Sequence, residues 1–412
     1  MRTVFTALVL FSLIGVGSVS GRDIHVGEDR AYSTLRSALD SAQDGDTVYV
    51  HEGVFAEGNI VIEKSLTLIG KGWPILDGKG EGEILTVKAG FFSIEGFDFR
   101  NSGTSFIHDN AAVKFDGVRK GQIIRNRFKN NYFAIYLANT SQCVVAGNEI
   151  ISNLETETLS GNGIHLWYCK QVTVQDNNIE GQRDGIYLEF VEDSEVFNNT
   201  AKLNHRYGLH FMFSDRNRYW NNTFTNNGAG VAVMYSRNVE MWANTFEYNW
   251  GDASYGLLLK DIYDSSIHQN LFEQNTIGML NDGCVRMEIK NNRFINNGWA
   301  VKIMANSNDN TFSFNDFIGN TFDVATNSRH NFNLFDRNYW SKYRGYDLDK
   351  NGVGDVPFHP VKLFSVLVEK NEPALILLRS LFVNLLDLAE EYIPLMTPEM
   401  LVDQKPLMSR VQ

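Results

Sequence analysis

The chain has few cysteines, and their number and spacing exclude a disulfide framework. Its 412 residues include only Cys143, Cys169 and Cys284, and an odd number leaves at least one of them unpaired. Charged residues are also scarce, at 21% beside 12% aromatic residues. This balance indicates a folded chain with a large core rather than a disordered one, and the length allows two or three domains of ordinary size.

Basic side chains are outnumbered by acidic ones. The sequence has 37 Lys and Arg against 49 Asp and Glu, for a formal net charge of -12. Nucleic acids and anionic polysaccharides favour proteins with clustered Lys and Arg. The acidic balance therefore speaks against binding of either polymer, and we expect no nucleic-acid partner.

An apolar run at the N-terminus is short of membrane-spanning length. Arg2 is followed by an almost wholly apolar stretch from Val4 to Gly17, and residues 18–20 are small, as signal peptidase requires. A spanning helix needs roughly 20 apolar residues, so we interpret residues 1–20 as an export signal rather than a membrane anchor. Cleavage removes one basic residue, makes the mature chain more acidic, and places it outside the cytoplasm.

Asparagine is the residue in excess, and its spacing is regular. Of the 42 asparagines, 36 lie between Asn126 and Asn338. An Asn followed two places later by an apolar residue recurs every 22 to 29 residues, and in eight of ten units Asn returns five places further on, from Asn131 and Asn153 to Asn320. Such a period is typical of solenoids. The repeating positions are Asn126, Asn148, Asn177, Asn199, Asn222, Asn244, Asn270, Asn292, Asn315 and Asn338.

The repeat predicts an all-β fold. Each unit closes with Gly or Ala and a short alternating segment, a strand signal, and three short strands in about 22 residues form one coil of a right-handed parallel β-helix. We expect this β-helix over residues 21–346, with a short helix within Ser33–Gln43 as its N-terminal cap. Coils stack about 4.8 Å apart, so asparagines at one register form ladders. Asn suits the corners because it tolerates left-handed backbone geometry and its amide bonds to the next coil.

One outward stripe of the solenoid carries side chains that are unusual for a solvated surface. The residue after the closing Gly points inward, so the next position and the one two further on face solvent. A contiguous exposed apolar surface marks a partner or ligand site, and we expect Trp167, Tyr187 and Glu189 to bind a partner. Coil by coil the stripe is Tyr136, Ala138, His165, Trp167, Tyr187, Glu189, His210, Met212, Ala232, Met234, Leu258, Lys260, Lys302 and Met304.

Two methionines on this stripe are candidate copper ligands. Met212 and Met234 fall on adjacent coils about 4.8 Å apart, with His210 beside them and His165 two coils below. Thioether sulfur with imidazole selects soft metals, above all Cu(I). The alternative is that the methionines belong to a protein-docking patch. Other methionines, Met241 and Met279 among them, fall on core positions.

The same stripe is a candidate for catalysis, since the β-helix is the usual scaffold of polysaccharide lyases, hydrolases and epimerases. Its outward columns show neither paired carboxylates on neighbouring coils nor a stacked acidic cluster for calcium-assisted lysis. We therefore expect a non-enzymatic protein, with a carbohydrate-active lyase or epimerase as the alternative. The residues that such an enzyme could use for proton abstraction are Arg183, Asp184, Tyr187, Glu189 and His210.

Residues 347–370 contain a candidate calcium loop and a closing segment. The oxygen ligands of such a loop would come from Asp347, Asp349, Asn351 and Asp355. Phe358 occupies the position of the usual bidentate Glu, so structural calcium and a metal-free turn both remain open.

Residues 371–412 are predicted to form an amphipathic helical tail. The helix begins near Pro373 and runs to about Tyr392, before Pro394. Its polar side chains occupy one narrow arc, from Arg379 to Glu391, and most of the remaining surface is apolar. The apolar face is wider than a single packing contact requires, which favours a helix that lies on a membrane or a membrane protein over one packed only on the solenoid. The apolar contact residues we expect are Leu377, Leu381, Leu385, Leu388 and Tyr392.

Several of these segments resemble those of the NosD family, the periplasmic accessory proteins of nitrous-oxide reductase maturation. The resemblance runs over nearly all of the mature chain. It implies a periplasmic β-helix that works at the inner membrane with an ABC transporter permease and its ATPase, and with a copper chaperone, to supply copper(I) to the reductase. It also implies that the tail contacts the permease, and it supplies no ligand list. The matching segments are Gly163–Trp167, Asp184–Glu189, Tyr207–Met212, Gly230–Tyr235 and Tyr346–Gly352.

Overall fold

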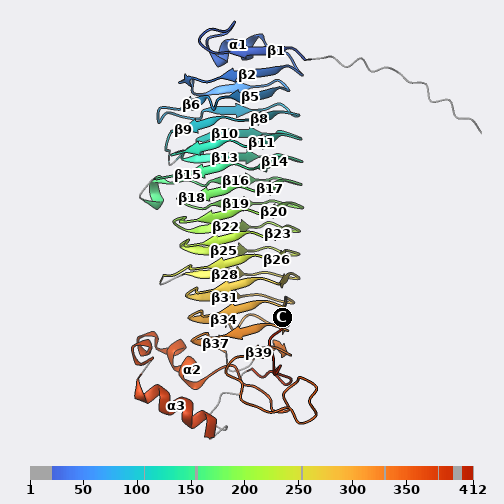
Figure 1. Ribbon diagram of the computed structural model, residues 1–412, viewed down its shortest axis with the longest axis vertical. Helices are drawn as coiled ribbons and strands as arrows, with labels where there is room; N and C mark the ends of the chain where they lie inside the picture. Colours follow the sequence, from blue (N-terminus) through green and yellow to red (C-terminus); the bar gives the residue numbers. More distant parts are fainter. Residues whose placement is uncertain are drawn as a thin grey trace, which may run out of the picture.

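The computed structural model describes residues 21–411 except 106, 154, 155, 252, 253, 329, 330, 379 and 393–400. The predicted export signal therefore lies outside the described residues. The chain winds into a parallel β-helix of about 13 turns with about 23 residues each, which confirms the predicted fold. Three sheets run along the solenoid, and its helices lie mainly at the two ends (Figure 1).

The three sheets are named A, B and C in the order in which each coil visits them. Sheet A has fourteen strands: β1 Asp23–Val26, β2 Thr47–His51, β5 Thr67–Lys71, β8 Ser93–Glu95, β11 Gln122–Ile124, β14 Val144–Ala146, β17 Thr173–Gln175, β20 Glu195–Phe197, β23 Arg218–Trp220, β26 Glu240–Trp242, β29 Ser266–His268, β32 Glu288–Lys290, β35 Thr311–Ser313 and β38 Leu334–Asp336. Sheet B has thirteen: β3 Val54–Phe55, β6 Ile75–Asp77, β9 Asp98–Arg100, β12 Arg127–Lys129, β15 Glu149–Ile151, β18 Asn178–Glu180, β21 Thr200–Lys202, β24 Thr223–Thr225, β27 Thr245–Glu247, β30 Leu271–Glu273, β33 Arg293–Ile295, β36 Asp316–Ile318 and β39 Tyr339–Trp340. Sheet C has twelve: β4 Ile60–Ile62, β7 Leu85–Val87, β10 Ala111–Asp116, β13 Phe133–Ala138, β16 Ile164–Trp167, β19 Ile186–Glu189, β22 Tyr207–Met212, β25 Ala229–Met234, β28 Tyr255–Lys260, β31 Ile277–Asp282, β34 Trp299–Ile303 and β37 Phe322–Thr326.

The core is a set of stacked columns in the interior of the solenoid. The middle residue of most three-residue strands is buried and its neighbours are not, which follows from the alternation of side chains along a strand. One column stacks aromatic rings with centroids 4.1 to 5.6 Å apart. Met241 and Met279 are buried as expected, and all three cysteines are buried and free. The members of the aromatic column are Phe224, Phe246, Phe272, Phe294, Phe317 and Trp340.

The asparagine ladders are confirmed as structural. At the corner between sheets A and B, the Asn222 Oδ1 accepts hydrogen bonds from the backbone N–H (2.9 Å) and the side-chain amide (3.0 Å) of Asn199. Its Nδ2 donates to the Val196 carbonyl (2.9 Å) and to Oδ1 of Asn244 (3.0 Å). The same pattern repeats along the column, so each amide ties three successive coils together.

The left-handed backbone at these corners lies one residue before each ladder Asn. Asn221 has φ 53° and Asn198 has φ 56°, whereas Asn222 and Asn199 are not among the described residues with positive φ. Our expectation that the ladder asparagines themselves adopt this conformation was wrong. Asn153, expected in the second ladder, is also exposed, and its backbone N–H donates to Asn130 Oδ1 (3.0 Å) instead.

We predict that Asn222→Ala lowers the free energy of unfolding by at least about 2 kcal/mol, because the buried Asn199 N–H and Val196 carbonyl both lose their partner. Asn178→Ala is the matched control, since Asn178 lies on the outer side of β18, and it should change stability by less than about 0.5 kcal/mol. Urea denaturation of both variants measures the difference. Equal losses would contradict a structural role for the ladder.

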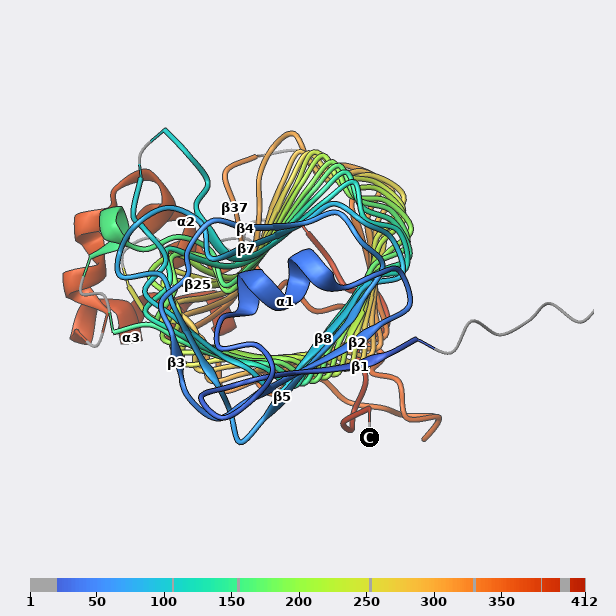
Figure 2. The same cartoon turned by 90° about the horizontal axis from the view of Figure 1, so that it is seen from above.

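The two ends of the solenoid are closed by different devices. Helix α1 (Leu35–Ser41) lies across the N-terminal end, as predicted (Figure 2), and buries Leu35, Ala38 and Leu39 against the first coils. At the other end, residues 401–411 return to the last coil although the sequence placed them in the tail. Asp403 Oδ2 accepts hydrogen bonds from the Asn338 N–H (3.0 Å), the Asn338 Nδ2 (3.1 Å) and the Trp340 Nε1 (3.0 Å). Asp403 thus takes the place of the next ladder asparagine.

The single helix predicted for the tail is divided. The chain forms α2 (Leu363–Lys370), a 3₁₀ segment η2 (Glu372–Leu377) and α3 (Leu381–Tyr392), and α2 had not been predicted. A further 3₁₀ turn, η1 (Glu157–Leu159), lies in the long loop before β16. Both η1 and the tail helices project from the same side of the solenoid (Figures 1 and 2).

Candidate functional site

The predicted stripe exists as two columns on the outer face of sheet C. The strand register pairs Tyr136, His165, Tyr187, His210 and Ala232 in one column. The second column, two residues further along each strand, contains Ala138, Trp167, Glu189, Met212, Met234 and Lys260. The predicted alternation of inner and outer positions is therefore confirmed, but Tyr136, Ala138 and Ala232 were expected to face solvent and are buried.

The expectation that both histidines face solvent was wrong. His165 is only 7% exposed and His210 only 4%, although both lie on the outer face. Aromatic neighbours cover them, because Tyr136 and Tyr187 each lie with ring centroids 4.7 Å from that of His165. Tyr187 and Tyr207 cover His210 in the same way, at 4.7 and 4.8 Å.

The two histidines cannot bind the same metal ion. Tyr187 lies between their rings, so His165 and His210 are two coils apart, or about 10 Å. Two nitrogens on one ion, each at about 2.0 to 2.1 Å, can be at most about 4 Å apart. A copper site on this stripe can therefore include one of these imidazoles, and His165 lies outside a site built around the methionines.

The two candidate thioethers are direct neighbours. Met212 ends β22, Met234 ends β25, and the two residues are paired in the sheet register, both partly exposed. His210 lies two residues before Met212 on the same outer face. Among the described residues no three His, Cys, Asp or Glu side chains gather where they could hold a metal ion. A metal site here would thus depend on sulfur.

A groove lies over the N-terminal half of the stripe, and we call it the sheet C groove. Its volume is about 970 Å³. The outer residues of β13, β16 and β19 line it, including the three predicted partner-binding residues Trp167, Tyr187 and Glu189, and residues 105 and 107–110 contribute as well. Its charged and imidazole side chains also include Glu83, Lys114, Asp116, His165 and Arg183. Met212 and Met234 are not part of this lining.

A cluster of polar side chains is buried at and beneath the groove. Within the described part of the chain, eight of its buried atoms have no hydrogen-bond partner. Asp184 lies 3.7 Å from the His210 Nδ1, 3.9 Å from Arg206 Nε and 4.0 Å from Arg183 Nε, too far for strong hydrogen bonds. Buried polar groups without partners are rare in native proteins and usually have a functional reason. The eight atoms are Asn162 Oδ1, His165 Nε2, Gln182 Nε2 and Oε1, Arg183 Nε, Asp184 Oδ2, and His210 Nδ1 and Nε2.

Burial controls the ionisation of the groove. It lowers the pKa of His165 to about 3, with a smaller contribution from Arg183, so this imidazole is neutral. Burial together with Glu189 raises the pKa of Tyr187 to about 12, and burial raises the pKa of Glu189 itself. At neutral pH the groove therefore presents His165 as a neutral donor or acceptor and Tyr187 as a neutral hydroxyl.

We predict that His165 makes the fold sensitive to acid. Its folded pKa lies below the unfolded value of about 6.5, so between these values the unfolded chain binds a proton that the folded chain does not. This term lowers the free energy of unfolding by about 2 kcal/mol between pH 7 and pH 5. Urea denaturation at both pH values should show a smaller loss for His165→Gln than for the unaltered protein. Equal losses would show that His165 titrates normally.

The candidate calcium ligands lie on an exposed loop that uses its own oxygens. Asp347 Oδ2 accepts a hydrogen bond from the Gly352 N–H (2.9 Å), and Asp355 Oδ2 accepts one from the Leu348 N–H (2.7 Å). Asn351 donates from its side chain to Asp349 Oδ2 (2.8 Å). This arrangement is that of an Asx-rich turn, and it does not itself call for a cation.

Beside the methionines runs an aromatic ladder that the sequence analysis missed. Tyr168, Phe190, Phe213 and Tyr235 stack at centroid distances of 4.6 to 5.3 Å at the corner between sheets C and A. They immediately follow Trp167, Glu189, Met212 and Met234 in the chain. This adjacency is the sequence feature from which the aromatic ladder could have been predicted.

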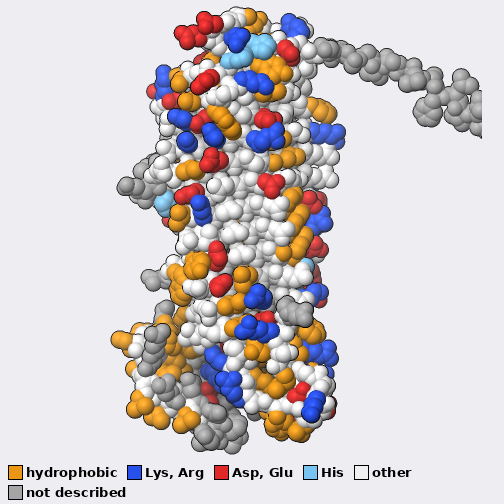
Figure 3. Space-filling model, viewed as in Figure 1, with side chains coloured by type: hydrophobic (Ala, Val, Ile, Leu, Met, Phe, Trp, Pro, Cys, Tyr) orange, Lys and Arg blue, Asp and Glu red, His pale blue; other side chains and the backbone are white. Residues whose placement is uncertain are grey.

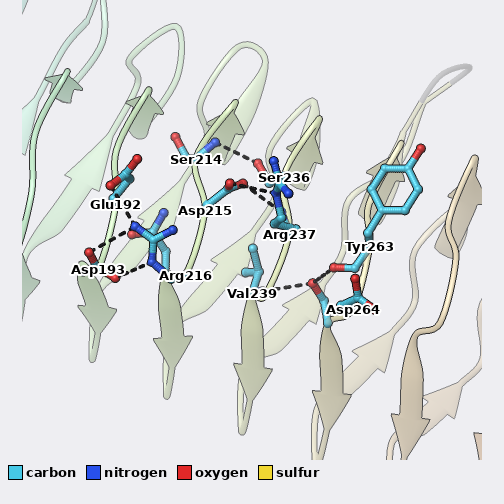
Figure 4. Close-up of polar contacts among 12 residues, drawn as sticks. Glu192, Asp193, Ser214, Asp215, Arg216, Ser236, Arg237, Val239, Tyr263 and Asp264 are labelled. Atoms are coloured by element: carbon cyan, nitrogen blue, oxygen red, sulfur yellow. Dashed lines mark hydrogen bonds and ion pairs between the residues drawn. The ribbon is translucent and has the colours of Figure 1, made fainter.

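Ion pairs continue from this ladder onto sheet A. Arg216 pairs with Glu192 and Asp193, each at 2.7 Å, and Arg237 pairs with Asp215 at 3.1 Å (Figure 4). The arginines are exposed and their carboxylate partners are at least partly exposed, so each pair contributes at most about 1 kcal/mol. The corner is therefore a mixed aromatic and charged surface next to the thioether pair.

Comparison with known proteins identifies the family. Residues 148–346 match the family described as "Periplasmic copper-binding protein (NosD)". The chain is 29% identical over 370 residues to a protein of Pseudomonas aeruginosa named "Probable ABC transporter binding protein NosD", covering 85% of this chain and 86% of that protein. A protein of Stutzerimonas stutzeri with the same name is 27% identical over 372 residues, covering 85% and 84%. The chain belongs to the NosD family.

Solved structures share the fold of this NosD-family chain. The catalytic domain of a family 87 alpha-1,3-glucanase in complex with tetrasaccharides superposes with a TM-score of 0.64. The two are 12% identical, and the match covers 77% of this chain and 69% of the glucanase. At this identity the similarity concerns the fold alone.

Proposed function

We propose that this protein is a non-enzymatic periplasmic accessory factor for nitrous-oxide reductase maturation. In this role it receives Cu(I) from a copper chaperone and presents it for assembly of the reductase, in concert with the permease and ATPase of an ABC transporter. The family description as periplasmic and copper-binding supports the compartment and the metal. The name shared by the two relatives supports a transporter partner and a binding role rather than catalysis.

The paired thioethers carry the copper part of the proposal. Met212 and Met234 are adjacent on an outer face, partly exposed, and within reach of a transferring partner. Thioethers bind Cu(I) in preference to harder ions. His210 supplies a nearby imidazole on β22, so it is the third candidate ligand. Among the described residues its Nδ1 and Nε2 have no hydrogen-bond partner, although Asp184 Oδ2 lies 3.7 Å from Nδ1. The exposure of the pair fits brief loading and release better than permanent storage.

We expect the double substitution Met212→Leu and Met234→Leu to weaken Cu(I) binding at least tenfold, which corresponds to about 1.4 kcal/mol. Leucine keeps the volume and removes the sulfur, so the fold should be unchanged. Anaerobic titration against a chromophoric Cu(I) chelator measures the affinity. Met408→Leu is the matched control, because Met408 is an exposed methionine at the far end of the chain. Unchanged affinity in the double variant would refute this site.

The tail helices carry the transporter part of the proposal. Val383 packs with Phe322, Phe364 and Val368, and it fixes α3 against α2 and the last coil of sheet C. Glu390, predicted to be in the polar arc, is buried instead, and its Oε1 accepts a hydrogen bond from the Leu363 N–H (2.7 Å). The polar arc therefore does not face solvent as a whole.

The large apolar side chains of α3 that do not pack in the cluster around Val383 are exposed. Leu381 is 75% exposed, Leu385 54% and Leu388 48%, with Phe382 beside them, and Figure 3 shows apolar side chains gathered over these helices. The side chain of Tyr392 lies outside the described residues. No helix in the described part of the chain is both long and apolar enough to cross a membrane. This surface fits a partner that is itself apolar, such as the permease.

We expect Leu381→Ser with Leu385→Ser to abolish co-purification with membranes that contain the permease, while the melting temperature stays unchanged because both side chains are already exposed. Val61→Ser is the matched control, an exposed apolar residue of β4 at the opposite end. Deleting the whole tail would be a poor test, because Asp403 closes the solenoid. Unaltered membrane association of the double variant would contradict the docking role.

A further inference from the structure

The sheet C groove is a built site that neither copper nor the transporter explains. Its floor includes a small hydrophobic cluster outside the solenoid core, in which Tyr132, Phe133 and Tyr136 are buried and Trp167 packs against them. Its volume of about 970 Å³ falls within the range of small-molecule sites. The methionine pair and α3 take no part in the lining, so the groove can be occupied independently of both.

The polar groups at the groove match a ligand that both donates and accepts hydrogen bonds. Of the buried polar cluster, Arg183 and His165 line the groove, whereas Asn162, Gln182 and Asp184 lie outside its lining. Among the described residues the Arg183 Nε is a donor without a hydrogen-bond partner, and the carboxylates of the lining are acceptors. His165 is buried, lines the groove, and its Nε2 is likewise without a partner among the described residues. A metal ion would pair only with the acceptors, and an apolar molecule would pair with neither kind of group. A hydroxyl group pairs with donors and acceptors alike.

The charge of the groove selects against anions. Four carboxylates line it, from Glu83, Asp109, Asp116 and Glu189, against the cationic side chains of Lys114 and Arg183. Lys114 Nζ lies 2.7 Å from Glu83 Oε1, so these two charges offset each other and three carboxylates remain against Arg183. A cleft with an excess of negative charge repels an acidic ligand. The ligand is therefore uncharged or basic.

The fold also disfavours an extended peptide as the occupant. Peptides that bind sheets commonly add a strand to a free edge. The strands of the groove floor, β10 to β19, are paired on both sides in sheet C, so their backbone groups are already used. The floor offers side chains only, a mixture of aromatic rings and polar groups.

We propose that the sheet C groove binds an uncharged oligosaccharide. Sugar hydroxyls can accept from Arg183, pair with His165 and donate to the carboxylates of the lining, and the apolar faces of the sugar rings pack on Trp167 and Tyr187. His165, Arg183 and Glu189 position the hydroxyls at the floor. The protein would in this way be held at a periplasmic glycan while its methionine pair remains open.

Isothermal titration of the full-length mature protein with tri-N-acetylchitotriose and with cellotetraose tests the proposal, with trigalacturonate as the acidic probe. At least one uncharged sugar should bind, and Trp167→Ala should weaken that binding at least tenfold. Trp242→Ala is the matched control, because Trp242 lies on the outer face of sheet A, and it should leave the affinity unchanged. Glu189→Gln provides a second groove variant if Trp167→Ala does not fold, and it should weaken binding at least threefold.

Three results would overturn the proposal: no binding of either uncharged sugar at 10 mM, a preference for trigalacturonate, or equal affinity in the variants of the groove and of Trp242. The methionine double variant should bind sugar normally, which separates this proposal from the copper site. Loss of sugar binding in that variant would also count against a separate groove.

Discussion

The stacking of backbone coils at a fixed spacing of about 4.8 Å is the constraint on which this molecule depends. In a closed coil, a strand that shifted by one residue would move its apolar side chains to the outside. The ladder amides reinforce this register at each corner, because Asn199 and Asn222 bond to their neighbours through both backbone and side chain. Every outer column, including the methionine pair, inherits its spacing from that register.

Register is also what the sequence could reveal. The interval between asparagines, with an apolar residue two places after each, placed Met212 beside Met234 and Trp167 beside Glu189 on the outer face, and the structure agrees. Features that depend on neighbours in space were less accessible. The burial of His210 comes from Tyr187 on the coil below and Tyr207 on its own strand, so alternation alone could not show it. The closure by Asp403 joins residues 65 positions apart in the chain, with no repeat to announce it.

The asparagine ladders and the polar cluster at the sheet C groove differ in how well their buried side chains are hydrogen-bonded, and this difference distinguishes structural residues from candidate binding residues. Asn222 uses both its oxygen and its nitrogen, whereas the side-chain amide of Gln182, equally buried one corner further on, bonds to none of the residues that the structure describes. An unpaired buried polar group costs about 1 to 3 kcal/mol, and the cluster contains several. A fold that satisfies so many amides elsewhere has the means to satisfy these as well. The two members of the cluster that line the groove, His165 and Arg183, would gain a partner from a ligand bound there, which supports a binding role for the groove.

The C-terminal end links the scaffold to the helices that we assign to the transporter. Lys302 on β34 pairs with Glu369 of α2 at 3.0 Å, in a partly buried position. Glu390 of α3 then holds the first turn of α2. These contacts fix the two helices to the last coils of sheet C. The ladder is continuous from Asn338 back to Asn222, so the coils beneath the helices and the coils that carry the thioether pair share one register. The docking that we propose for α3 would therefore orient the solenoid as a single body.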